Sequence, residues 1–99
     1  MIVDDDKKIL KFLKDFLELE NYTVITAENG EDVLKKINTL PDLILLDINM
    51  PHMSGLEVCK RIRDYVSCPI IFLTACIEDE DKIIGLKSVG DDYIVKPFN

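Results

Sequence analysis

The chain has 99 residues, 47% apolar and 31% charged, so it is long enough for one domain with a modest core and too apolar for a disordered chain. Nineteen acidic and twelve basic residues give a net charge of −7 with the histidine neutral, which makes the chain a poor candidate for direct binding to nucleic acid. No apolar run is long enough to span a membrane, and no secretion signal opens the chain.

The number and spacing of the cysteines indicate the redox compartment in which the protein works. Cys59, Cys68 and Cys76 are an odd number without a C-x-x-C pair, which argues against a disulfide framework and against a zinc site. Reduced thiols in a cytoplasmic protein are therefore the favoured interpretation.

The first strand and the first helix lie at the start of the chain. Met1–Val3 is short and apolar, and three aspartates follow it. A helix is predicted from about Lys7 to Glu20, because apolar residues recur there at intervals of three and four. Asp6 stands at the N-cap position of this helix. The apolar side comprises Ile9, Phe12, Leu13, Phe16 and Leu17.

The next elements continue the alternation. Tyr22–Ala27 is rich in β-formers and predicts a second strand, and Asn29-Gly30 predicts a turn. A helical pattern then runs to Pro41, which stops it. Leu43–Leu46 is continuously apolar, as expected of a strand buried on both faces, and Asp47 follows it.

The second half repeats this order. A third helix is predicted from Leu56 to about Tyr65, and a fourth strand over Ile70–Leu73. A fourth helix is predicted over 79–89 and a fifth strand over 93–95. Strictly alternating strands and helices predict an α/β fold in which helices cover both faces of one parallel sheet.

The functional site of such a sheet lies at the carboxyl ends of its strands. The residues at these ends are Asp4 and Asp5 after the first strand, Asp47 after the third, Thr74 after the fourth and Lys96 after the fifth. Clustered carboxylates repel one another unless a cation lies between them, and Mg²⁺ prefers such oxygen ligands. Asp47 is the strongest nucleophile candidate, because a carboxylate can hold a phosphoryl group as an acyl phosphate.

Together these segments resemble the receiver domain of two-component response regulators, over the whole chain. Each motif alone is weak, whereas all of them in this order are specific. The motifs are Val3-Asp4-Asp5-Asp6, Leu46-Asp47-Ile48-Asn49-Met50-Pro51, Ser54-Gly55, Leu73-Thr74-Ala75 and Lys96-Pro97-Phe98.

The resemblance implies a flavodoxin-like, doubly wound sheet of five strands in the order 2-1-3-4-5. It implies that Asp47 is the phosphoacceptor for a sensor histidine kinase or a histidine phosphotransfer protein. It further implies that Asp5 binds Mg²⁺ directly, Asp4 assists through water and Asn49 binds the ion through its backbone carbonyl.

The resemblance also assigns the switch. Thr74 becomes the switch hydroxyl, Tyr93 the switch aromatic and Lys96 the lysine that pairs with the phosphoryl group, while the Lys96–Pro97 peptide bond is expected to be cis. The implied protein is a signalling switch that catalyses its own phosphorylation and slow dephosphorylation, and not a turnover enzyme.

Two departures from the family pattern concern the ends of the chain. The family's domain usually starts a few residues earlier and carries a fifth helix after the last strand, which is missing here. Residues 1–99 are therefore expected to be one receiver domain from a longer response regulator, with transcription as the output through a DNA-binding domain outside this chain. A homodimer is a further expectation, weakened because the family's dimer surface includes that fifth helix.

Three other classes of protein fit the sequence less well. A flavodoxin-like redox carrier needs a phosphate-binding loop after the first strand, where this chain has three aspartates. A haloacid-dehalogenase-type phosphatase needs a second acid two residues after the nucleophile, where this chain has Asn49. An inactive interaction module of receiver shape has no support in the sequence, because all the matching site residues are present.

Overall fold

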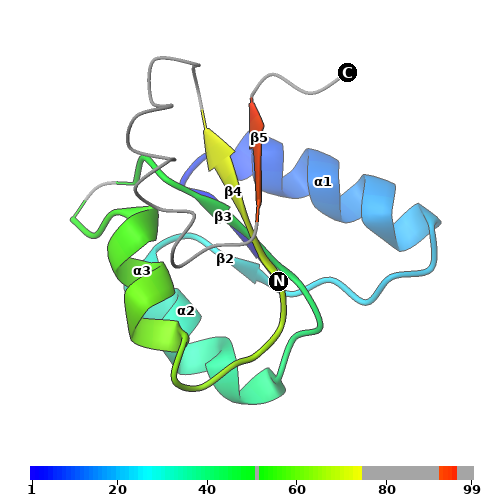
Figure 1. Ribbon diagram of the computed structural model, residues 1–99. Coiled ribbons are helices and arrows are strands. Elements are labelled where there is room, and N and C mark those ends of the chain that lie inside the picture. Colours follow the sequence, from blue (N-terminus) through cyan, green and yellow to red (C-terminus); the bar gives the residue numbers. More distant parts are fainter. Residues whose placement is uncertain (51, 75–91, 96–99) are drawn as a thin grey trace.

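The computed structural model describes residues 1–50, 52–74 and 92–95 (Figure 1). The described strands form one parallel sheet in the order β2-β1-β3-β4-β5, which confirms the predicted fold. The elements are β1 (Ile2–Val3), α1 (Lys7–Leu19), β2 (Thr26–Ala27), α2 (Gly30–Lys36), a 3₁₀ helix (Ile37–Thr39), β3 (Ile44–Asp47), α3 (Gly55–Ile62), β4 (Ile70–Thr74) and β5 (Asp92–Val95).

The sheet separates two unequal layers. Figure 1 shows α1 on one face, and α2 and α3 together on the other. Side chains alternate between the faces of a strand, and in β3 Ile44 and Leu46 are fully buried whereas Leu45 between them is half-buried. The main core therefore lies between the sheet and α2 and α3, where it includes Val33, Ile44, Leu46, Val58, Ile62, Ile70 and Phe72.

Helix α1 forms where the sequence predicts it and ends one residue earlier. Asp6 is its N-cap, because its carboxylate accepts a hydrogen bond from the Lys8 amide at 2.9 Å. Leu10 is the buried residue of this helix, while Phe12 and Phe16 are 56% and 54% exposed. No other described helix covers this face of the sheet, so part of the predicted apolar side of α1 faces solvent. None of the helices in the described part of the chain is long and apolar enough to cross a membrane.

The predicted second strand is wrong in its length. Only Thr26 and Ala27 of the predicted Tyr22–Ala27 belong to β2, because β1 offers only two partners, Ile2 opposite Thr26 and Val3 opposite Ala27. A strand needs a neighbour to pair with, and residues 22–25 extend beyond the start of β1.

A lysine joins α2 to the outer side of β2. The Lys36 ammonium donates a hydrogen bond to the Thr26 carbonyl at 2.7 Å and another to the Asp32 carboxylate at 3.1 Å. Asp32 in turn accepts a hydrogen bond from the Glu28 amide at 3.3 Å. These contacts hold the loop after β2, and with it the carboxyl end of that strand, against α2.

The remaining boundaries shift by one to three residues. Helix α3 begins at Gly55, one residue before its predicted start, because Ser54 is its N-cap, and its last residue is Ile62 rather than Tyr65. Strands β4 and β5 each include one residue more than predicted. The predicted fourth helix at 79–89 lies outside the described residues.

Candidate functional site

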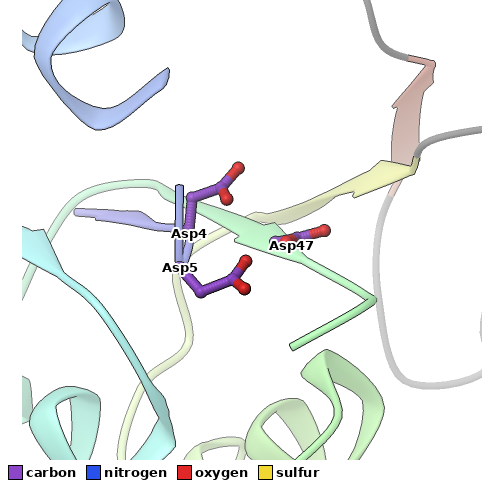
Figure 2. A group of neighbouring side chains, drawn as sticks. All are labelled: Asp4, Asp5 and Asp47. Carbon is purple, nitrogen blue, oxygen red and sulfur yellow. The ribbon is translucent and has the colours of Figure 1, made fainter. Parts of the chain in front are cut away.

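Three aspartates meet at the carboxyl ends of the two central strands. Asp4 and Asp5 follow β1, and Asp47 is the last residue of the neighbouring β3 (Figure 2). One carboxylate oxygen from each of the three lies within 4.8 Å of the other two. Asp4 and Asp47 are buried, at 0% and 3% exposure, whereas Asp5 is exposed. The predicted cluster therefore forms, with two acids inside the protein and one at its surface.

Local hydrogen bonds fix Asp4 in this position. The Asp4 amide donates to the Ala27 carbonyl of β2 at 3.1 Å. The Asp4 carboxylate accepts from the Asp6 amide at 2.9 Å. The chain thus turns sharply from β1 into α1, and the same turn that makes Asp6 the helix cap leaves Asp4 and Asp5 at the end of the strand. The predicted capping role of Asp6 is confirmed.

Asp47 is held by its own loop and by β4. Its carboxylate accepts a hydrogen bond from the Asn49 amide at 3.2 Å. The next residue, Ile48, donates its amide to the Leu73 carbonyl of β4 at 3.0 Å. The Asn49 amide therefore lies beside the Asp47 carboxylate.

The residues assigned to the switch are described only in part. Thr74 is the last residue of β4, next to Leu73, which lies opposite Asp47 in the sheet. Tyr93 lies in β5, opposite Phe72. The backbone therefore places Thr74 at the same end of the sheet as Asp47, one strand away. Lys96, Pro97 and their peptide bond lie outside the described residues.

The donor set fits a hard divalent cation. Mg²⁺ holds oxygen ligands at about 2.1 Å, so two direct ligands lie no more than roughly 4.2 Å apart. Oxygens within 4.8 Å meet this limit after small side-chain rotations, or with one carboxylate acting through a water. Three carboxylates this close together also repel one another, and a cation relieves that repulsion.

Comparison with known proteins identifies the family. The sequence model of the response regulator receiver domain family matches residues 1–99. The alkaline phosphatase synthesis transcriptional regulatory protein PhoP of Bacillus subtilis is 46% identical over 100% of this chain and 42% of its own length. The nisin biosynthesis regulatory protein NisR of Lactococcus lactis is 51% identical over 100% of this chain and 44% of its own length. The chain belongs to the response regulator receiver domain family.

A solved structure supports the same conclusion. The response regulator TrrA of Thermotoga maritima, in complex with Mg²⁺-BeF, is 43% identical, with a TM-score of 0.85 over 99% of this chain and 85% of its own. Receiver domains of response regulators bind Mg²⁺ at an acidic pocket and are phosphorylated by histidine kinases. Response regulators are signalling proteins rather than turnover enzymes. The chain spans less than half the length of the curated relatives named above.

The structure adds one site contact that the sequence did not reveal. Gly55 packs directly against the backbone of Asp47. The signals at this position in the sequence are the Ser54-Gly55 motif and the presence of a glycine directly after the N-cap residue, where a better helix former would ordinarily stand.

Proposed function

We propose that this domain is a phosphorylation-activated signalling switch whose phosphoacceptor is Asp47. The observation that carries the proposal is the cluster of Asp4, Asp5 and Asp47 at the ends of β1 and β3. The family membership of the chain supports the same function. The phosphoryl donor is a phosphohistidine on a sensor histidine kinase or on a histidine phosphotransfer protein.

The proposed ligands of Mg²⁺ are Asp5 and Asp47 directly, Asp4 through water, and the backbone carbonyl of Asn49. A bound Mg²⁺ supplies positive charge that offsets the negative charge of the phosphoryl oxygens. A carboxylate oxygen of Asp47 attacks phosphorus, the new O–P bond forms as the N–P bond to histidine breaks, and the imidazole leaves with the bonding electron pair. The contact between the Asp47 carboxylate and the Asn49 amide keeps that carboxylate at the strand end.

The remaining assigned residues contact the phosphoryl group and couple its arrival to a change in the protein surface. Lys96 pairs with its charge, and the Thr74 hydroxyl donates a hydrogen bond to one of its oxygens. The movement of Thr74 leaves space into which Tyr93 turns, so the surface around the fourth helix and β5 changes. The pairing of β4 with β5, which aligns Thr74 with Val95, supports this coupling.

The proposal extends to the whole protein. Residues 1–99 form a single receiver domain of a longer, cytoplasmic response regulator that controls transcription through a separate DNA-binding domain and dimerises through its receiver. The name of PhoP as a transcriptional regulatory protein, together with the 42% of its length that is matched, supports this. The exposed Phe12 and Phe16 support a fifth helix, in the remainder of the protein, that packs beside α1.

Intact-mass spectrometry tests the proposal. The protein is incubated with acetyl phosphate, with and without Mg²⁺, beside the Asp47→Asn variant. We expect one phosphoryl group per chain, dependent on both Mg²⁺ and Asp47. No gain of mass by a chain with a cooperative thermal transition would refute the switch, and sustained hydrolysis of phosphate esters would indicate a phosphatase instead.

A further inference from the structure

The first residue of α3 lies against the peptide that follows the proposed phosphoacceptor. A Cβ atom built on Gly55 would overlap the Asp47 carbonyl oxygen, and it would lie 2.9 Å from both the Asp47 carbonyl carbon and the Ile48 Cα. Real Cβ contacts essentially never fall below 3.0 Å. The φ angle of Gly55 is not positive. Glycine is therefore needed at this position for space and not for its backbone conformation.

A hydrogen bond joins the same two segments. The Gly55 amide donates to the Ile48 carbonyl at 2.9 Å, which closes the loop between β3 and α3. On its other side, Ile48 donates its amide to Leu73 of β4. The end of β3 is thus held between a neighbouring strand and the first turn of a helix.

We propose that Gly55 is a positioning residue for the phosphoryl-transfer site, an inference that rests on the proposed function of Asp47. Because Gly55 has no side chain, α3 approaches closely enough to fix the peptide between Asp47 and Ile48. That peptide determines the direction of the Asp47 carboxylate and leads into Asn49, whose amide bonds to the same carboxylate. A displacement there moves the phosphoacceptor and a proposed Mg²⁺ ligand together.

The size of the displacement sets the expected effect. A Cβ at Gly55 meets backbone atoms of the central sheet, which cannot rotate away, so α3 and the end of β3 must separate by a sizeable part of an ångström. Reacting groups must be held to within about 0.5 Å of their productive positions. A misplacement of about 1 Å can cost about 100-fold in rate.

Gly30 provides a matched control. It too is a buried glycine at the first residue of a helix, and its φ angle is also not positive. A Cβ on Gly30 would lie 2.6 Å from the Met53 sulfur and 3.0 Å from a methyl group of Val58. These atoms belong to side chains, and the flexible Met53 can move, so Gly30→Ala tests the general cost of adding a methyl group at a buried helix start.

The experiment compares the full 99-residue chain with Gly55→Ala and Gly30→Ala. Two quantities are measured: the rate of phosphorylation by acetyl phosphate, and the dissociation constant for Mg²⁺, each corrected for the fraction of folded protein. We expect Gly55→Ala to lower the rate by about 10- to 100-fold and to weaken Mg²⁺ binding by about tenfold, whereas Gly30→Ala stays within about twofold of the wild type.

Each outcome decides between the two proposals. A wild-type chain that takes up no phosphoryl group refutes the proposed function, and the inference on Gly55 fails with it. A wild-type chain that is phosphorylated while Gly55→Ala matches Gly30→Ala refutes the inference alone. Should Gly55→Ala be unfolded in buffer, it is measured in trimethylamine N-oxide, which favours the compact state. A variant that remains unfolded there assigns Gly55 to folding in general and also refutes the inference.

Discussion

Replacement of Asp47 with asparagine should stabilise the metal-free protein. The substitution keeps the size of the side chain and an oxygen that can accept the hydrogen bond from the Asn49 amide. It removes one of three negative charges at the strand ends. Two of the three repulsive pairs, those of Asp47 with Asp4 and with Asp5, disappear with it.

The separation of the carboxylates gives the magnitude. At the upper limit of 4.8 Å, two charged oxygens repel by about 0.9 kcal/mol per pair in bulk water and by about 3.5 kcal/mol at an effective dielectric constant of about 20. Asp5 is exposed, so its repulsion with Asp47 lies near the lower value, whereas the repulsion of the buried pair Asp4 and Asp47 lies between the two values. We expect a rise of at least about 2 kcal/mol in the free energy of unfolding, which corresponds to roughly 8–16 °C in melting temperature for a domain of this size.

Thermal unfolding followed by circular dichroism measures the effect in EDTA and in excess Mg²⁺. The exposed Asp64 lies outside the cluster, so Asp64→Asn is the control and should change the melting temperature little. Mg²⁺ should stabilise the wild type by about 2.7 kcal/mol at a hundredfold excess over its dissociation constant, and Asp47→Asn by much less. A lower melting temperature for Asp47→Asn in EDTA, or an equal response of both proteins to Mg²⁺, would refute the reasoning.

Three further predictions concern stability. Asp6→Ala removes the N-cap of α1 and should lower the free energy of unfolding in urea by about 1 kcal/mol. Because Asp6 caps the helix and is not a proposed Mg²⁺ ligand, a change in Mg²⁺ affinity beyond about twofold would contradict this assignment. Leu10→Ala should cost about 2–5 kcal/mol and Phe16→Ala less than about 1 kcal/mol, because Leu10 is 6% exposed and Phe16 54%; equal losses would contradict the orientation of α1. Burial raises the pKa of the Cys68 thiol above its ordinary value of 9.0. The folded state therefore keeps a proton that the unfolded state loses, and the free energy of unfolding should fall as the pH rises past about 9. In urea titrations at alkaline pH, Cys68→Ser should remove this contribution to the slope of unfolding free energy against pH.

The parallel sheet could be predicted from the residue pattern, whereas the order of its strands followed from the family resemblance. Leu43–Leu46 and Ile70–Leu73 are continuously apolar. In the helical segments, by contrast, apolar residues recur at intervals of three and four. The length of β2 could not be predicted, because it depends on how many residues β1 offers for pairing and not on the β-propensity of Tyr22–Ala27.

The acidic cluster was predictable for a geometric reason. The carboxyl ends of parallel strands meet at one edge of the sheet, so Asp4, Asp5 and Asp47 come together wherever β1 and β3 are neighbours. The close approach of Gly55 to Asp47 was not predictable, since the Ser54-Gly55 motif does not report how closely two backbone segments approach.

The bond between Lys36 and Thr26 bears on how the protein avoids aggregation. β2 is an outer strand, and its inward carbonyls at Ile25 and Ala27 already accept hydrogen bonds from the chain of β1. The Thr26 carbonyl between them accepts instead from the Lys36 ammonium. An outer strand with free carbonyls is a template on which a strand of another molecule can add, and a lysine at such an edge opposes that addition by occupying the acceptor and placing a charge there. The last residue of α2 thus occupies an outward carbonyl of β2 that a strand of another molecule would need for pairing.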